Sequence, residues 1–138
     1  MTTDSSHLLL LHGAIVVGLG LLTGVPFWIA ILRADSPERL RAWRVAHTTV
    51  LMDGLLLLVA GLMRTHLDLT VAQWAVAEWA LVVSAYAFGF ALIGGAWAGE
   101  RGLNPTPTGV RTLFFLGHAI GATGAFVGVG LLIRGLVN

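Results

Sequence analysis

The sequence predicts an all-α integral membrane protein, a bundle of four transmembrane helices embedded in a lipid bilayer. Hydrophobic residues make up 57% of the chain and charged residues only 11%, whereas soluble domains contain about 25% charged residues. The apolar residues gather in four stretches, and about 20 helical residues suffice to cross a hydrocarbon core of about 30 Å. Helices satisfy their own backbone hydrogen bonds in lipid. We therefore expect one domain over residues 1–138, with helices at roughly 8–32, 46–63, 71–98 and 110–133.

The first two helices have recognisable starts. No basic segment precedes the first apolar run, and this run is too long for a signal peptide, so we interpret it as a retained helix. Before the second helix, Ser36 has the character of an N-cap, Pro37 suits the first helical position and Glu38 suits the first turn.

The other two connections are short. Residues 64–70 form a brief link between the second and third helices. Residues 100–109 have the composition of a turn. Its turn-forming residues are Gly102, Asn104, Pro105, Pro107 and Gly109.

Glycines recur three or four residues apart, which is the spacing that lets helix backbones approach closely in lipid. Such sets are Gly20 with Gly24, Gly95 with Gly99, and Gly117, Gly121, Gly124 and Gly128. The pattern predicts a tight bundle, and because four short helices enclose little interior, it favours a homo-oligomer.

The arginines predict the orientation, since cytoplasmic loops carry the excess of basic residues. The first and third loops hold Arg33, Arg39, Arg41, Arg44, Arg101 and Arg111, and the opposite side holds Arg64 and Arg134. We expect a multi-pass protein of the plasma membrane with both termini on the non-cytoplasmic side. So few basic residues, all near loops, do not predict nucleic-acid binding, and the lack of cysteine excludes iron–sulfur clusters.

Ionisable side chains inside the spans indicate function, because each costs on the order of 3 kcal/mol or more in lipid. His47 lies near the start of the second helix, where a neutral imidazole can bind a metal or a haem iron, or simply bond to a carbonyl. Asp53 lies mid-helix with no basic residue within a turn, so it is either a protonated donor in a polar cavity or a structural link between helices. The two are six residues apart, about 120° and about 9 Å along a helix, so they can border one cavity without touching.

The remaining polar residues favour structural roles or leave the choice open. Tyr86 is the only tyrosine, and its hydroxyl needs a partner in lipid, from either a site or the core. Glu78 is expected at interfacial depth, and Trp43 as an interface anchor. For His12 and His118 we expect packing or carbonyl bonding.

The second helix resembles that of the styrene oxide isomerases, small membrane enzymes with four helices. Their helix opens with a similar Ser-Pro-Glu followed by Trp-x-x-Ala-His, and Asn-Gly comes six residues later. The matching residues here are Ser36, Pro37, Glu38, Trp43, Ala46, His47, Asp53 and Gly54, and His12-Gly13 is similar to an N-terminal His-Gly of that family.

The chain also resembles the hydroxylaminobenzene mutases, which have nearly this length. The similar segments are Gly20–Gly24, Ala46-His47 with Met52-Asp53-Gly54, and Tyr86-Ala87 with Trp97 and Gly99. Two positions depart from these families: Asp53 stands where an Asn is expected, and Phe88 where the mutases have an Asn.

The first resemblance implies a haem b held between the subunits of a trimer, with His47 as the axial iron ligand. Trp43 and His12 would adjoin the cofactor, and Asp53 and Tyr86 would face a small aromatic substrate. Ferric iron would act as a Lewis acid on an epoxide, and a 1,2-hydride shift would give an aldehyde in a dry cavity. A mutase would instead activate the N–O bond of an arylhydroxylamine to give an aminophenol.

Two functions of other classes remain open. A haem electron carrier would need two axial ligands, such as His47 with His12 or His118, and would be reversibly reduced. A small exporter would need an acidic residue in its first helix, and the stretch 8–32 has none.

Overall fold

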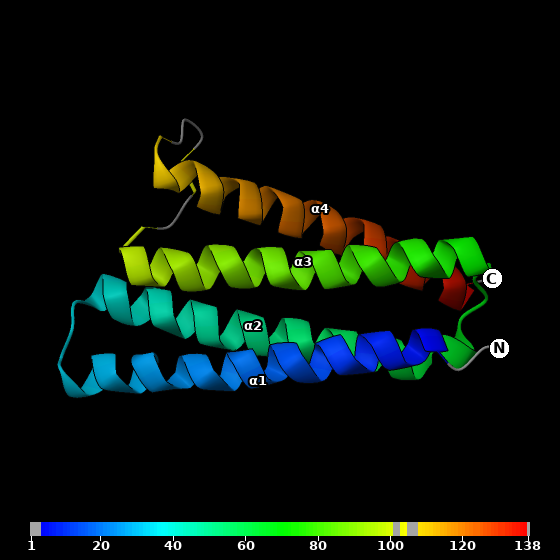
Figure 1. Cartoon of the computed structure of the whole chain (residues 1–138), viewed down its shortest axis with the longest axis horizontal. Coiled ribbons are helices and arrows are strands. Elements are labelled where there is room, and N and C mark those ends of the chain that lie inside the picture. The colour runs from blue at the N-terminus through cyan, green and yellow to red at the C-terminus, as the bar shows by residue number, and fades with distance from the viewer. Residues whose placement is uncertain (1–3, 101–102, 105–107, 138) are drawn as a thin grey trace.

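The computed structural model describes residues 4–100, 103–104 and 108–137, with side chains from residue 7 onward. The described residues contain no strand, and their four long helices are each long and apolar enough to cross a membrane. In chain order the elements are α1 (Asp4–Leu32), α2 (Pro37–Met63), the 3-10 turn η1 (Arg64–His66), α3 (Val71–Ala98) and α4 (Val110–Val137) (Figure 1). The predicted fold class is confirmed. Arg101, Gly102, Pro105 and Pro107, which entered the loop predictions, lie outside the described residues.

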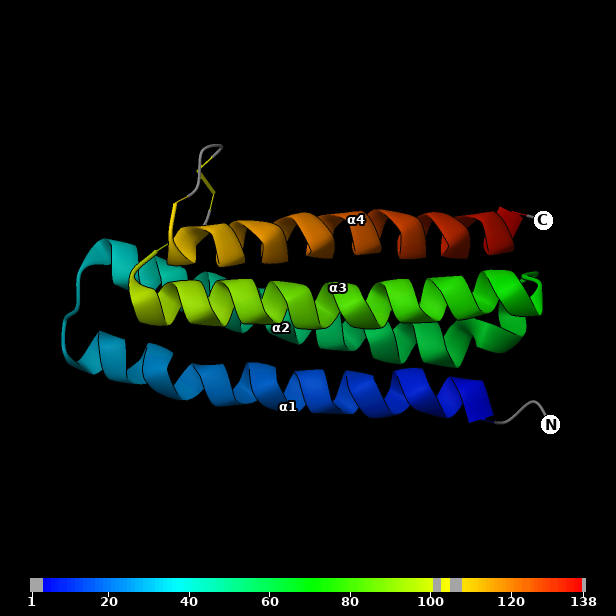
Figure 2. The ribbon, with the colours of Figure 1, turned by 45° about the horizontal axis from the view of Figure 1, so that its top comes forward.

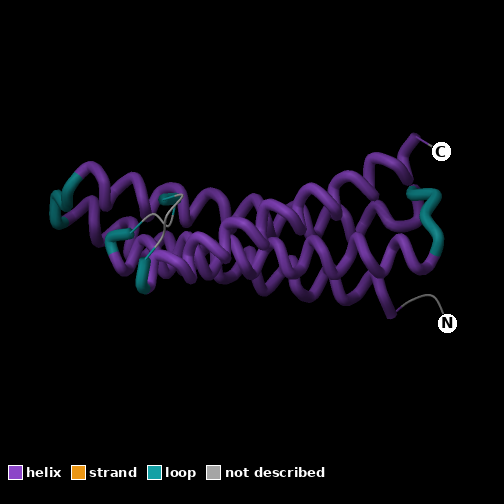
Figure 3. The backbone as a smooth tube through the Cα atoms, turned by 90° about the horizontal axis from the view of Figure 1, so that it is seen from above, coloured by secondary structure: helices purple, strands orange, loops and turns teal. Residues whose placement is uncertain are grey.

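The helices run up and down, so that both termini lie at one end of the bundle (Figures 1 and 2). α1 packs along α2 and α3 along α4, and the two hairpins join mainly through α2 and α3. α1 also contacts α3. Seen from above, the connections gather at the two ends of a long bundle (Figure 3). This order makes α2 and α3 the central pair.

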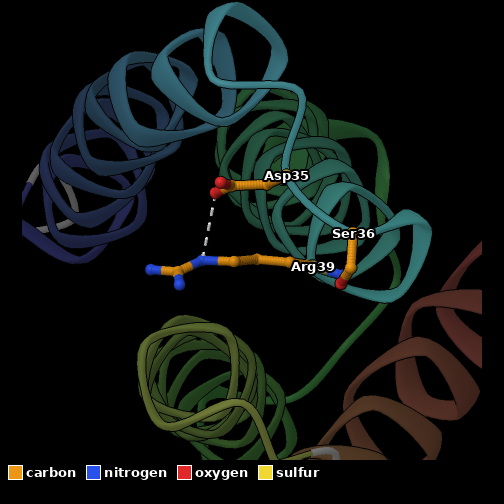
Figure 4. A network of polar contacts seen from close by, with 3 residues as sticks. All are labelled: Asp35, Ser36 and Arg39. Atoms are coloured by element: carbon orange, nitrogen blue, oxygen red, sulfur yellow. Dashed lines mark hydrogen bonds and ion pairs between the residues drawn. The ribbon is translucent and has the colours of Figure 1, made fainter.

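The cap at Ser36 confirms the predicted start of α2. The Ser36 hydroxyl accepts a hydrogen bond from the backbone N–H of Arg39 at 3.3 Å, with Pro37 in the first turn. Arg39 also forms an ion pair with Asp35 at 3.4 Å (Figure 4). α2 therefore begins well before the apolar stretch 46–63, because its first turns carry arginines that suit the membrane surface.

Glycines bring the helices into backbone contact, as their spacing predicts. A Cβ on Gly124 would lie 2.6 Å from the carbonyl oxygen of Ala80 on α3. Between α1 and α2, a Cβ on Gly54 would lie 2.6 Å from the backbone nitrogen of Val17. Gly99 differs from the expectation: it ends α3 in the left-handed conformation, at φ 69°, and packs against nothing. Its role is a helix C-cap.

Trp43 is not an interface anchor, which corrects the expectation. Its side chain is only 1% exposed and packs among Ala30, Ala46 and Ala96. The indole of Trp97, itself largely exposed, stands edge-on to Trp43 at 5.3 Å between ring centroids. Trp43 lies on the α2 face that is turned toward α3, and this face is covered by the neighbouring helices.

Candidate functional site at His47

His47 projects from α2 toward α1, where its ring nitrogen Nδ1 lies 2.8 Å from the carbonyl oxygen of Gly20. Because a carbonyl oxygen only accepts, Nδ1 must carry the hydrogen and donate it. In a neutral imidazole the lone pair then belongs to Nε2. None of the described residues gives Nε2 a hydrogen-bond partner. The fold thus fixes one nitrogen of His47 and leaves the other free to bind.

Thr23 supports the same carbonyl from within α1. Its buried hydroxyl donates to the Gly20 carbonyl oxygen at 2.6 Å and lies 3.4 Å from His47 Nδ1. The sequence singled out neither Thr23 nor the Gly20 carbonyl as part of a site. The available signal was a threonine three residues after a glycine on the helix that faces His47.

Two glycines of α1 make room for the ring. A Cβ on Gly20 would lie 2.9 Å from the backbone nitrogen of Leu51, so the glycine lets α2 approach closely. A Cβ on Gly24 would lie 3.2 Å from Cε1 of His47. The Gly20–Gly24 spacing that resembles the mutases therefore has a physical role here, because it seats the imidazole against a helical carbonyl.

An aromatic ring and a cation lie beside His47, on the side of the arginine-rich loops. The Phe27 ring centroid is 6.3 Å from that of His47, with the planes tilted by 31°. The guanidinium of Arg44, one turn before His47, lies 5.9 Å from the centre of the Phe27 ring. Neither residue was predicted as part of a site.

His12 and Tyr86 form a pair that joins α1 to α3. His12 Nδ1 and the Tyr86 hydroxyl are 2.9 Å apart, and the two rings meet edge-on at 5.6 Å. This pair supplies the partner that the Tyr86 hydroxyl was expected to need. Of the two roles expected for His12, the ring contact is packing, and the hydrogen bond goes to a hydroxyl instead of a carbonyl. Seventy-four positions separate the two residues, so only the tertiary structure could reveal the contact.

Tyr86 stands between two apolar grooves. One, of about 380 Å³, is bounded by α1, α2 and α3 and includes Val50 and Gly89. The other, of about 610 Å³, lies over α3 and α4 and includes both His12 and Tyr86. The hydroxyl of Tyr86 is thus a polar group on walls that are apolar apart from His12 in the second groove.

Asp53 and His47 lie on different faces of α2. On α2, Gly54 contacts α1, as His47 does, whereas Val50 faces Gly89 of α3. Helical geometry places Asp53 on the α3 side of Val50 and His47 on the α1 side. The buried Oδ2 atom of Asp53 has no hydrogen-bond partner among the described residues. A cavity shared by His47 and Asp53 stays a prediction.

Glu78 is buried in the bundle, at 5% exposure, and its expected interfacial depth stays a prediction. The His118 ring lies 6.1 Å from that of Phe88, between α4 and α3. Neither His12 nor His118 contacts His47 in the described structure, so a single chain does not present the two axial ligands of the electron-carrier hypothesis.

The donor set suits a cofactor that brings most of its own ligands. Among the described residues, no group of three or more His, Cys, Asp or Glu side chains lies close enough to hold a bare metal ion. Haem iron needs only an axial ligand from the protein. A single imidazole with Nδ1 held by a carbonyl and Nε2 free meets that need.

Comparison with known proteins identifies a family for the chain. A family model described as styrene oxide isomerase matches residues 5–137, nearly the whole chain. The matched range includes His12, His47, Asp53 and Tyr86. A comparison with curated proteins gave no match. On the extent of the family match, the chain belongs to the styrene oxide isomerase family.

Proposed function

We propose that this protein is a haem-dependent membrane isomerase that rearranges a small aryl epoxide to an aldehyde. Membership of an isomerase family supports the reaction class, and the apolar grooves beside Tyr86 suit a hydrophobic aromatic substrate. The observation that carries the proposal is the hydrogen bond from His47 Nδ1 to the Gly20 carbonyl oxygen. It sets the tautomer in which Nε2 is free to bind iron.

In this proposal His47 would bind the iron of haem b through Nε2, and Arg44 would pair with a haem propionate. Arg44 is suited to this because it lies one turn from His47 on the same helix and its guanidinium rests on Phe27. A guanidinium pairs well with a carboxylate because it offers parallel donors. Trp43, also one turn from His47, is buried in the helix core and would support the haem site from there.

The chain's own residues would hold the substrate and exclude water. When bound, ferric haem supplies Lewis acidity toward the epoxide oxygen, which weakens the benzylic C–O bond. Apolar groove walls keep water from the developing cation, so that a 1,2-hydride shift outcompetes hydrolysis to a diol. Tyr86, oriented by His12, offers its hydroxyl to the substrate oxygen. Asp53 would face the substrate from the α3 side.

The test is a haem spectrum with a matched histidine control. Protein produced with sufficient haem and solubilised in detergent should show a Soret band, and His47→Ala should lose it. His66→Ala removes an exposed histidine of η1 at the opposite end of the bundle and should keep it. Absence of the band from the wild type, or full retention in His47→Ala, would refute the haem proposal.

Substrate assays then define the reaction. Styrene oxide should yield an aldehyde, with loss of activity in His47→Ala. Conversion of phenylhydroxylamine to an aminophenol, without epoxide turnover, would instead assign the mutase reaction.

We further propose that the protein works as a homotrimer with haem between subunits. The resemblance to the isomerases supports this assembly. The native mass of the haem-loaded, detergent-solubilised protein tests it, and a monomeric mass for haem-loaded protein would exclude it.

A further inference from the structure

Three buried polar atoms lack hydrogen-bond partners where η1 joins α2 to α3, at the end of the bundle that carries both termini (Figure 1). The atoms are Arg64 Nη1, Trp74 Nε1 and Glu78 Oε1, and none has a hydrogen-bond partner among the described residues. Trp74 is 4% exposed and Glu78 5%. Leaving a buried donor or acceptor unpaired is costly, and more so for a charged group. Three such groups in one region favour a polar partner that can satisfy them.

The three residues form one cluster. The guanidinium of Arg64, at the junction of α2 and η1, lies 5.2 Å from the ring centre of Trp74. Trp74 and Glu78 are one turn apart and therefore on the same face of α3. Arg64 on η1 and Glu78 on α3 are the two charged members of this cluster. The two do not form a direct ion pair, and the ion pairs of the described residues lie at the opposite end of the bundle.

We propose that Arg64, Trp74 and Glu78 form a binding site for an internal water molecule. The guanidinium and the indole N–H are donors, and the free carboxyl oxygen is an acceptor. One water can accept from both donors and donate to Glu78, and buried waters typically make about three such bonds. A metal cation would be repelled by Arg64, an anion would be repelled by an ionised Glu78, and an apolar group would leave all three atoms unpaired.

The location gives this water a structural function. It links η1, at the end of α2, to α3 where the chain turns between them. It would thus stabilise the contact between α2 and α3 at the end of the bundle that carries both termini. Seventeen residues of α2, roughly 25 Å, separate Arg64 from His47. The buried side chains of Leu57 and Leu81 lie in the core between the two levels. Buried leucine side chains thus separate the proposed water site from His47. This site does not depend on the proposed function.

The experiment detects water at the indole of Trp74. In ¹⁵N-labelled protein in detergent micelles, the Trp74 indole N–H is assigned by its absence in Trp74→Phe. In a ¹⁵N-edited rotating-frame Overhauser experiment, this N–H should show a cross-peak to water that does not arise from hydrogen exchange. Glu78→Gln retains an acceptor oxygen and should keep the cross-peak, whereas Glu78→Leu should lose it. If Glu78→Leu does not fold, Arg64 gives the same comparison: Arg64→Gln retains a donor and should keep the cross-peak, whereas Arg64→Leu should lose it.

Two results would overturn the inference. One is the absence of a water cross-peak from folded wild-type protein, which would mean that Arg64 and Glu78 pair directly or that the site is dry. The other is an undiminished cross-peak in a folded leucine variant, which would mean that Trp74 meets bulk water. Because the site is remote from His47, all folded variants should keep the Soret band if the haem proposal is correct. Loss or retention of that band therefore tests the two proposals separately.

Discussion

At the scale of single residues, the site depends on how one helical carbonyl is used. The Gly20 oxygen accepts from Thr23 within its own helix and from His47 across the interface. This arrangement needs close helix approach, because an imidazole reaches a neighbouring backbone only where side chains are absent. The free Nε2 atom of His47 is therefore a consequence of the glycines on α1.

Gly24→Ala should weaken haem binding. The added Cβ would lie 3.2 Å from His47 Cε1 and would push the ring from its seat. Loss of the partners that orient a metal ligand typically costs 10–100-fold in affinity, and we expect about tenfold here, measured by haem titration of apoprotein. Gly18→Ala is the matched control, since a Cβ there meets nothing within 4 Å. Equal affinity of the two variants would show that Gly24 does not position the ligand.

Asp53→Asn should stabilise the protein. Oδ2 of Asp53 is buried without a partner among the described residues, and a neutral amide costs less to bury than a carboxylate. We expect a gain of about 1 kcal/mol, seen as a higher Tm in detergent, with the Soret band unchanged. A lower Tm would mean that the carboxyl group of Asp53 makes a favourable interaction in the assembled protein.

At the scale of helices, glycine determines how α4 is held. Four of its buried residues are glycines, Gly117, Gly121, Gly128 and Gly135, and the half-buried Gly124 also lies against α3. In lipid there is little hydrophobic drive for helices to associate, so close van der Waals packing at such faces stabilises the bundle. Ser84 adds a buried hydrogen bond to the Gly121 carbonyl oxygen at 2.6 Å.

Gly124→Ala should loosen the α3–α4 hairpin. The new Cβ would lie 2.6 Å from the Ala80 carbonyl oxygen, which is backbone and cannot move aside cheaply. Overpacking of this kind costs about 1–3 kcal/mol, measured as resistance to thermal or SDS unfolding. Gly130→Ala, where a Cβ meets nothing within 4 Å, should be neutral or slightly stabilising. Similar stability of the two variants would refute tight packing at Gly124.

At the scale of the whole molecule, both termini and η1 lie at one end and the arginine-rich loops at the other. The surface between these ends is broadly apolar, as expected for a multi-pass membrane protein. The arginine bias then predicts that the termini lie outside the cytoplasm.

Labelling of single cysteines should show this orientation, because the chain contains no cysteine of its own. Thr65→Cys lies at the terminal end and Ala34→Cys at the arginine-rich end, and both positions are exposed. A membrane-impermeant maleimide added to intact cells should modify Thr65→Cys only. Modification of Ala34→Cys alone would reverse the orientation.

The sequence by itself determined the features that act locally along the chain. Apolar stretches gave four spans, Ser36 marked the start of α2, and His47 and Asp53 stood out as polar groups within a helix. The resemblance around His47 also pointed to the family that the comparison supports. These signals depend on residues close in sequence, and lipid makes each buried polar residue conspicuous.

Only the tertiary structure decided which partners meet across helices. It paired His47 with the Gly20 carbonyl, joined His12 to Tyr86, and buried Trp43 and Glu78 inside the bundle. The physical reason is that these helices are apolar on every side, so periodicity does not reveal which face turns inward. The choice of face comes from the register of glycines on neighbouring helices, and that register exists only once the helices have packed.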